Sequence, residues 1–238
     1  MRLNFVSWHM SGSKRNDHSY FQAHQPVYQQ QTAEGHSVRA LYMFTAMADY
    51  ARLTKDSDKI KACKTIWKNI TNRRMYIHGG VGSAHIGERF SFDYDLPNDM
   101  AYAETCASIA LIFFTERLMR IGRSSEYADI IKGVLYNVVL ASTSIDGKAF
   151  FYDNYLECIP EFLKYQHCRH GIRDKYHTCS CCPPNVLRIL ADIERYIFLW
   201  PKMVSRSIST SQVPMNSLSM KPGARYRLIQ KCRGVAGT

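Results

Sequence analysis

The 238-residue sequence has no apolar run of the length that a membrane-spanning helix needs. Its first ten residues lack the long apolar segment of a secretory signal peptide. The eight cysteines show no regular spacing of the kind that marks a disulfide framework, which favours a reducing compartment over secretion. We therefore expect a cytoplasmic protein with no membrane partner.

Acidic residues are absent from Trp200 to Thr238, although that stretch contains seven basic ones. The whole chain carries a net charge of +11, whereas residues 1–199 alone carry +4. Because the basic character is largely a property of the tail, we do not expect a nucleic-acid partner from it. A phosphate-binding loop is also absent, since the glycines of Gly79–Ser83 lack both the Lys-Ser/Thr ending and a clear preceding strand.

The hydrophobic content of 46% is enough for a core, and its spacing is mainly helical. Strand signals are few, and the clearest is an extended segment or short strand from Ala149 to Tyr155. The pattern predicts an all-α array of helical hairpins joined by short links. The expected helices are His36–Thr54, Asp56–Arg73 with Asp56 as N-cap, Met100–Arg120 with Asp99 as cap, Ser124–Ala141 and Pro183–Phe198.

The ends of the chain differ from its middle. Residues 1–19 are polar and aperiodic, so we expect little order there. Residues 20–199 carry the helical pattern and form the expected main domain. Residues 200–238 are expected to be a poorly ordered tail or the remnant of a following β-domain, in which Lys221–Gln230 could form one arm of a hairpin.

Three cysteines, Cys179, Cys181 and Cys182, fall within four residues and are followed by Pro183 and Pro184. Neighbouring cysteines rarely bridge each other without strain, so the cluster indicates a metal site or a reactive thiolate rather than a disulfide. The two prolines stiffen the backbone there. The alternative is a buried turn that happens to contain cysteine, because free cysteine is often buried.

A second pair, Glu104 and Cys106, stands two residues apart near a helix start. The two side chains do not share one helix face, but they can converge where a loop enters a helix. Together with Cys181 and Cys182 they would make a set of one oxygen and three sulfurs, which favours zinc. Alternatively, Glu104 is a first-turn acid that complements the helix dipole.

Glu88 and His36 are weaker candidates. Glu88 follows Gly87 among aromatic residues, which could raise its pKa toward that of a general acid, but the residues by themselves favour a solvated carboxylate paired with Arg89. His36 stands at a helix entry, where it could bind a substrate hydroxyl or serve only as a structural cap. The high aromatic content, with fifteen tyrosines, is frequent in sugar-binding clefts as well as in structural proteins.

Taken in order, several of these motifs resemble glycoside hydrolase family 127, the β-L-arabinofuranosidase family. The resemblance runs from about Tyr20 to Phe198. The resemblance is specific because all of the motifs occur together and in order, whereas each motif alone would be a weak signal. The motifs are His36-Ser-Val-Arg39, Gly79-Gly-Val-Gly-Ser83, Gly87-Glu88, Asp99-Met-Ala-Tyr-Ala-Glu-Thr-Cys106 and Cys181-Cys-Pro-Pro-Asn185.

The resemblance implies an (α/α)6 barrel followed by β-sandwich domains, and a retaining hydrolase of terminal β-L-arabinofuranosyl groups. It implies that Cys181, bound to Zn²⁺, is the nucleophile and that Glu88 is the acid/base. Substrate contacts would come from His36 and Tyr152. The implied zinc ligands are Glu104, Cys106, Cys181 and Cys182, which leaves Cys179 as a bystander.

Family members are much longer, so the resemblance implies a fragment covering the second half of the barrel. An incomplete barrel exposes apolar faces, so we expect the isolated chain to aggregate or to need a partner, and a homodimer is one assembly we allow. We expect impaired activity for the same reason. Two other functions stay open: a non-catalytic zinc-binding structural or interaction fragment, and a redox thiol protein.

Overall fold

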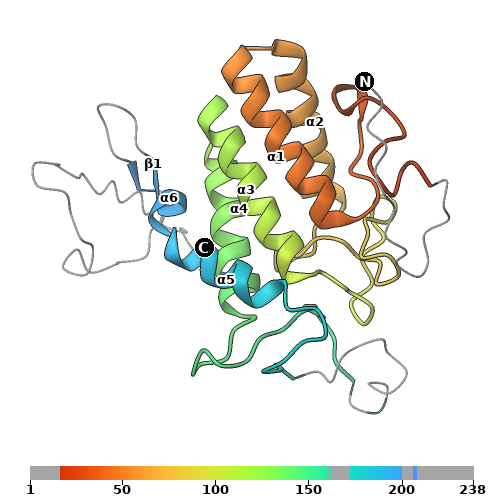
Figure 1. Cartoon of the computed structure of the whole chain (residues 1–238), viewed down its shortest axis with the longest axis vertical. Helices are drawn as coiled ribbons and strands as arrows, with labels where there is room; N and C mark the ends of the chain where they lie inside the picture. The colour runs from red at the N-terminus through yellow and green to blue at the C-terminus, as the bar shows by residue number, and fades with distance from the viewer. Residues whose placement is uncertain (1–16, 160, 162–171, 200–205, 208–238) are drawn as a thin grey trace, which may run out of the picture. The chain divides into compact units, whose positions relative to one another are not determined.

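The computed structural model describes residues 17–159, 161, 172–199 and 206–207. The described residues up to Leu187 belong to one compact unit, and those from Arg188 onward belong to a second. The first unit contains most of the helices and all of the site described below (Figure 1). None of the described helices is both long enough and apolar enough to cross a membrane.

Helices α1 (Ser37–Thr54) and α3 (Thr105–Ile121) pack side by side at the centre of the first unit (Figure 1). Every residue of α3 from Thr105 to Glu116 is buried, which fits its almost wholly apolar sequence. Phe44 of α1 contacts Phe114 of α3, with 5.8 Å between the ring centroids. This central pair forms the helical core predicted from the apolar spacing.

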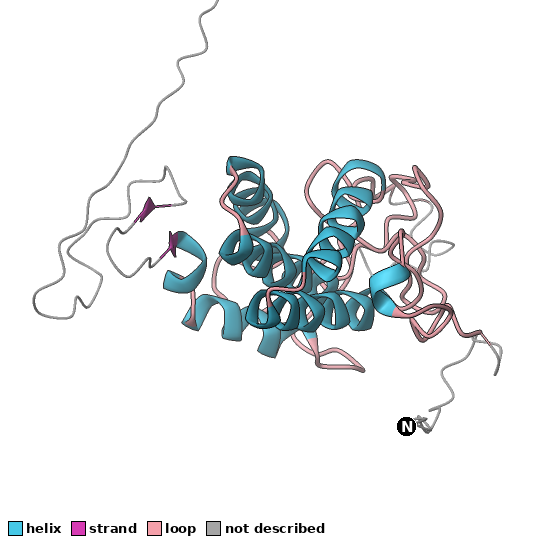
Figure 2. Cartoon of the chain, turned by 90° about the horizontal axis from the view of Figure 1, so that it is seen from above, coloured by secondary structure: helices cyan, strands magenta, loops and turns pink. Residues whose placement is uncertain are grey.

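Helices α2 (Ser57–Arg73) and α4 (Ser125–Val134) each pack against α3. Figure 2 shows the helices of the chain, in cyan, from above. The Asp56 side chain accepts hydrogen bonds from the backbone N–H groups of residues 58 and 59, so it caps α2 as predicted. Ser124 caps α4 in the same way. A π-helical stretch, η2 (Leu135–Leu140), continues α4, and a short 3₁₀ helix, η1 (Val27–Gln29), precedes α1.

The long loops gather at the end of the first unit where α1 and α3 begin (Figure 1). An isolated antiparallel bridge joins His36 to Arg89, just before α1. A second bridge joins Glu104 to Asp153, just before α3. The first turns of both central helices are therefore held against loops that come from distant parts of the sequence.

The third helix begins later than the sequence predicts. Its N-cap is Glu104 rather than Asp99, so Met100–Ala103 lies outside the helix. The reason is a set of backbone hydrogen bonds to the glycine loop: Tyr102 N–H donates to Ser83 O, and Ala103 N–H donates to Gly82 O. These bonds replace helical ones over four residues whose sequence alone reads as helix.

The last predicted helix, Pro183–Phe198, is shorter and broken. Helix α5 (Cys182–Ala191) ends eight residues after Pro183, and α6 (Glu194–Ile197) follows after a turn. Strands β1 (Phe198–Leu199) and β2 (Arg206–Ser207) form an antiparallel pair. Ala149–Tyr155 is extended with isolated bridges rather than a strand of a sheet. The hairpin arm expected at Lys221–Gln230 lies outside the described residues.

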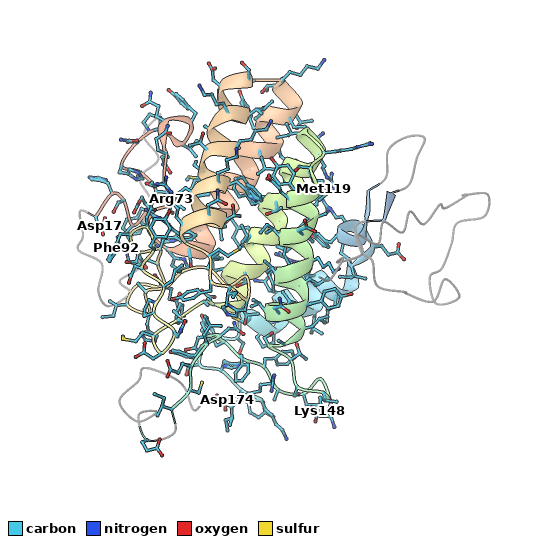
Figure 3. All side chains as sticks on the ribbon, turned by 180° about the vertical axis from the view of Figure 1, so that it is seen from behind. Asp17, Arg73, Phe92, Met119, Lys148 and Asp174 are labelled. Carbon is cyan, nitrogen blue, oxygen red and sulfur yellow. The ribbon has the colours of Figure 1, made fainter. Side chains whose placement is uncertain are left out.

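A polar cluster fixes the end of α2 to the loop that follows it. Arg73, labelled in Figure 3 near Phe92, donates to Asp93 at 2.9 Å, and Arg74 donates to Asp93 at 2.7 Å. Asn69 donates to the same carboxylate at 2.9 Å. Burial by itself would raise the pKa of Asp93, but these three hydrogen bonds outweigh it and lower that pKa to about 2.

We predict that Asp93→Asn removes an acid-sensitive part of the stability. Because the folded pKa lies below the ordinary value of 3.8, the stabilisation is complete above about pH 4 and is lost as the pH falls toward 2. The variant should lose about 1 to 2 kcal/mol of unfolding free energy at pH 7. As the pH falls from 4 to 2, the unfolding free energy of the variant should decrease less than that of the parent.

The measurement is urea unfolding followed by circular dichroism at several pH values. Asp129→Asn, at an exposed carboxylate on α4, is the control and should leave the pH dependence unchanged. An Asp93→Asn curve parallel to that of the parent across this range would contradict the prediction.

Candidate active site and metal centre

Four side chains converge where α3 and α5 begin: Glu104, Cys106, Cys181 and Cys182. One ligand atom from each lies within 4.8 Å of the others. The Cys106 and Cys182 sulfurs are 3.4 Å apart, and the Cys181 and Cys182 sulfurs are 3.8 Å apart. Glu104 Oε1 lies 3.6 Å from Cys181 Sγ. The structure thus brings together the full set of metal-ligand candidates named from the sequence.

The entry to α3 directs Glu104 and Cys106 toward this cluster. Ala103 has a positive φ of 40°, an uncommon angle for a residue with a side chain, and it turns the chain immediately before Glu104. The glycine loop makes room for this turn, since a Cβ on Gly80 would come within 2.7 Å of Ala103 Cβ. The loop Gly79–Ser83 therefore shapes the backbone that presents the carboxylate.

The entry to α5 supplies the other two sulfurs. Cys182 is the first residue of α5, and Pro183 and Pro184 occupy its first turn, where missing N–H groups cost nothing. Cys182 is fully buried and Cys181 is partly buried, whereas Cys179 is exposed. The cluster accordingly uses two of the three closely spaced cysteines.

The cluster fits a thiophilic divalent metal. Zinc in a tetrahedral site has Zn–S distances of about 2.3 Å, which place ligand sulfurs about 3.8 Å apart, close to the separations in the cluster. Glu104 Oε2 is buried and has no hydrogen-bond partner among the described residues. A buried, unpaired carboxylate oxygen is costly, and a cation would satisfy it.

Burial and mutual contacts shift the pKa values of the cluster in opposite directions. Burial raises the pKa of the Glu104 carboxyl well above its ordinary value. Hydrogen bonds from the Cys106 and Cys182 thiols lower the pKa of Cys181. The hydrogen bond between Cys106 and Cys181 raises the pKa of Cys106, and burial raises the pKa of Cys182. Among the three thiols, that of Cys181 therefore has the lowest pKa.

A second group of side chains surrounds Glu88. His36 Nε2 lies 3.1 Å from Glu88 Oε2, and the Tyr102 hydroxyl donates to Glu88 Oε1 at 2.8 Å. Glu88 itself has a positive φ of 50°, directly after Gly87 with a φ of 79°. Two left-handed residues in succession make a tight turn that aims the carboxylate at its partners.

The structure supports neither interpretation of Glu88 from the sequence, because its pKa is not raised and its carboxylate pairs with His36 rather than Arg89. The hydrogen bond with His36 lowers the pKa of Glu88, and this effect exceeds the opposing effect of burial. The hydrogen bond from Tyr102 acts in the same direction. The sequence indicated aromatic neighbours correctly, but it did not indicate that one of them donates a hydrogen bond to the carboxylate.

Tyr152 connects the two groups. Its hydroxyl lies 3.3 Å from Cys181 Sγ and 3.3 Å from Glu88 Oε1. Tyr102, Tyr152, Cys106 and Cys182 also share one buried cluster, against which Val38 packs. His36, Glu88, Tyr152 and Cys181 are therefore parts of a continuous network, although they come from four separate segments.

Sequence reasoning did not single out two residues of the network, Tyr102 and Asn185. Asn185 Nδ2 donates to Cys106 Sγ at 3.0 Å. Both residues lie inside motifs quoted above: Tyr102 stands two positions before Glu104, and Asn185 follows the two prolines. Their closeness in sequence to the ligand candidates is the signal that could have identified them. His177 was likewise not singled out, and its ring packs 5.8 Å from that of Tyr152.

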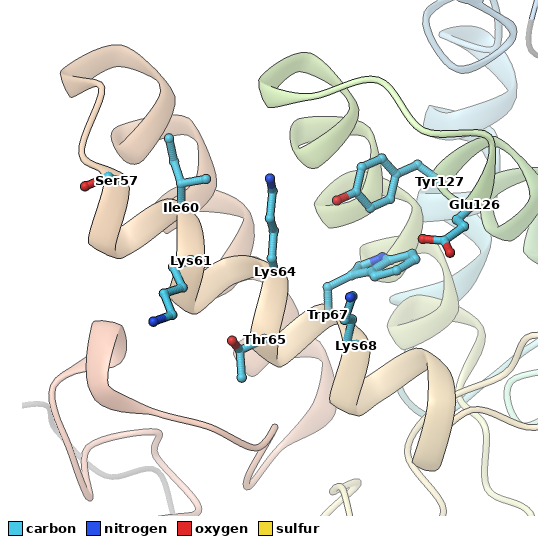
Figure 4. A pocket seen from close by; sticks show the side chains of 9 residues that line it. All are labelled: Ser57, Ile60, Lys61, Lys64, Thr65, Trp67, Lys68, Glu126 and Tyr127. Carbon is cyan, nitrogen blue, oxygen red and sulfur yellow. The ribbon is translucent and has the colours of Figure 1, made fainter.

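A hollow of about 540 Å³ lies elsewhere, between α2 and α4 (Figure 4). Three lysines, Lys61, Lys64 and Lys68, lie along its α2 side, and Glu126 lies opposite. None of the four metal-ligand candidates lines it. Its lysines are exposed, as expected for a solvated helix face, and we assign no chemistry to it.

Comparisons with known proteins agree on one family. A family model described as "Beta-L-arabinofuranosidase, GH127 catalytic domain" matches residues 4–195. A curated relative from Bifidobacterium longum, the "Non-reducing end beta-L-arabinofuranosidase", is 44% identical over 182 residues. That match covers 76% of this chain and 28% of the relative, so the chain spans less than a third of the relative's length.

Solved structures give the same result. A GH127 β-L-arabinofuranosidase from Geobacillus stearothermophilus T6 is 47% identical with a TM-score of 0.76, covering 81% of this chain and 31% of that one. Another structure, a GH127 β-arabinofuranosidase, is 38% identical with a TM-score of 0.74, covering 80% and 29%. Both likenesses extend over most of this chain and a minor part of each relative.

The cluster predicts that a divalent metal shields the partly buried thiol of Cys181. With Zn²⁺ present, Cys181 should resist alkylation by iodoacetamide, and removal of the metal by a chelator should make it reactive. The exposed Cys158 and Cys179 serve as internal controls and should be alkylated in both states. Mass spectrometry of proteolytic fragments identifies each site. Equal alkylation of Cys181 with metal and with chelator would exclude a metal at this cluster.

Proposed function

The chain belongs to the GH127 β-L-arabinofuranosidase family, and we propose that it hydrolyses terminal β-L-arabinofuranosyl groups with retention of configuration. The observation that carries the proposal is the arrangement of Cys181 and Glu88 on either side of the Tyr152 hydroxyl. A nucleophile and an acid/base that face one site are what a two-step retaining mechanism needs. Family membership supports the choice of sugar.

We assign the metal as Zn²⁺, with Glu104, Cys106, Cys181 and Cys182 as its ligands. Three sulfurs and one oxygen form a donor set that zinc prefers. When bound, zinc would keep its cysteine ligands deprotonated near neutral pH. The low pKa of Cys181 among the three thiols supports its role as the sulfur that reacts.

In the first step, the Cys181 thiolate attacks the anomeric carbon and forms a C–S bond. The bond from that carbon to the leaving oxygen breaks, and Glu88, in its carboxylic acid form, gives the leaving oxygen its proton. His36 Nε2 lies 3.1 Å from Glu88 Oε2, so a hydrogen bond between the two side chains orients the carboxyl group. His36 therefore has a second role besides its predicted contact with the sugar.

In the second step, Glu88 acts as a base. Its carboxylate removes a proton from water while the water oxygen attacks the anomeric carbon and the C–S bond breaks. The lowered pKa of Glu88 suits this half of the cycle, because it favours the ionised carboxylate, which is the form that accepts a proton. Two displacements at the same carbon give net retention.

Tyr152 and Tyr102 position the reacting groups. Burial raises the pKa of both hydroxyls, so both stay protonated and can donate. Tyr102 holds Glu88 through one carboxylate oxygen, and Tyr152 contacts both that oxygen and the Cys181 sulfur. We propose that the Tyr152 hydroxyl donates its hydrogen bond first to the Cys181 thiolate and then, once Glu88 has lost its proton, to the Glu88 carboxylate.

We further propose that the helices are part of an (α/α)6 barrel. The parallel packing of α1 and α3, with α2 and α4 against them, supports this architecture. Two relatives matched in sequence or structure are longer than this chain, which covers 28% and 31% of their lengths. The competing function is a zinc-binding structural module, in which Glu88 would have no task.

The assay is release of 4-nitrophenol from its β-L-arabinofuranoside by the purified, zinc-loaded chain. Cys181→Ser should reduce release to the background, because an alkoxide is not available at neutral pH. Cys179→Ser changes an exposed cysteine two residues away and should retain the parental rate. If the zinc-loaded parent binds one metal yet releases nothing, the structural module is the better reading.

Glu88→Gln should show a loss that depends on the leaving group. An alkyl arabinofuranoside, which needs protonation, should lose about 10²- to 10⁴-fold in rate. The nitrophenyl substrate should lose less in its first step, because nitrophenolate leaves without a proton. Azide should then restore turnover by replacing the base-activated water. A uniform loss for both substrates with no azide effect would argue against the acid/base role.

A further inference from the structure

Asn185 makes a direct contact with one of the four ligand side chains. Its amide nitrogen lies 3.0 Å from Cys106 Sγ, a sulfur that is 1% exposed. An amide NH₂ group can only donate, so the sulfur is the acceptor. Nothing in the reaction described above uses this contact.

The chemistry of the contact favours the ligating form of Cys106. A hydrogen bond to an ionised acceptor is about twice as strong as one to a neutral acceptor. The amide therefore stabilises the thiolate of Cys106 more than its thiol.

The position of Asn185 adds a structural effect. It lies in the first turn of α5, and its backbone N–H donates to Cys181 O at 3.4 Å. Cys106 lies in the first turn of α3. One side chain thus joins the two helix entries that bring the ligands together, and Pro183 and Pro184 limit how far its backbone can move.

We propose that Asn185 is a positioning residue of the metal centre, which holds the Cys106 sulfur in the orientation that ligation needs and so raises metal affinity. The inference rests on the metal site of the proposed function. Residues that bond to metal ligands typically change affinity by about 10- to 100-fold. Asn185 should have an effect of that size.

The test compares Asn185→Leu, which keeps the size and removes the donor, with Asn185→Asp, which places a carboxylate against the sulfur. Zinc affinity is measured by competition with a chelating indicator on the full chain. We expect about 10- to 100-fold weaker binding for the leucine variant and a larger loss for the aspartate variant, with one metal per chain in both. Asn72→Leu, at an exposed position on α2, should bind as the parent does.

A Co²⁺-loaded sample gives a readout that a loss of packing alone would not produce. Removing the N–H donor raises the energy of the sulfur lone pair, so the thiolate-to-cobalt absorption band should move to longer wavelength. Circular dichroism establishes folding, and if the leucine variant does not fold, the aspartate variant carries the same comparison.

The outcomes separate the two proposals. Parental affinity and an unmoved band in a folded Asn185 variant would overturn the role of Asn185 and leave the metal site intact. A parent chain that binds neither Zn²⁺ nor Co²⁺ would overturn the metal site and this inference together.

Discussion

The junction of the α3 and α5 entries is the constraint on which the rest of the site depends. It buries a carboxylate and two cysteine sulfurs, and one carboxylate oxygen has no partner among the described residues. Such a group costs on the order of 1 to 3 kcal/mol when it stays unpaired. Burial raises the pKa of Glu104, which favours its neutral form, whereas a bound cation would favour the carboxylate and take the oxygen and sulfurs as ligands. The junction is therefore costly as a structural feature and favourable as a metal site.

The groups around Glu88 are built on the same junction. Tyr102 and Tyr152 hold the carboxylate, and both rings pack in the buried cluster with Cys106 and Cys182. A shift of the α5 entry would move Cys181 directly and Glu88 through Tyr152. The distance between the proposed nucleophile and acid/base is consequently set by the cluster itself, and the strained turns at Glu88 and Ala103 are tolerated because their neighbours fix them.

Local sequence predicted the elements whose causes are local. Helices α1 and α2 follow the apolar spacing, and Asp56 caps α2 because a carboxylate at that position satisfies N–H groups beside it. The start of α3 could not be predicted this way, because hydrogen bonds to Ser83 and Gly82, some twenty residues earlier, replace the helical ones. The lowered pKa of Glu88 could not be predicted for the same reason, since its main cause is a hydrogen bond with His36, over fifty residues away in the sequence.

The four ligand candidates were predicted because cysteines and a carboxylate at these spacings suit few functions other than metal binding or thiolate chemistry. Tyr102 and Asn185 were missed because tyrosine and asparagine suit many environments.

The chain spans about 28% to 31% of the lengths of two matched relatives, and the segment that matches the family, residues 4–195, contains both proposed reacting groups and all four metal-ligand candidates. The proposed chemistry thus lies in segments between His36 and Asn185. Binding a sugar needs more than its reacting atoms, because walls that exclude water and hold hydroxyls supply affinity and orientation. A deficit in such walls would weaken substrate binding and the alignment of the anomeric carbon, whereas a deficit at the α3–α5 junction would remove the nucleophile. The proposed metal binding and the proposed catalysis are therefore separable, and the proposed metal binding depends on fewer residues.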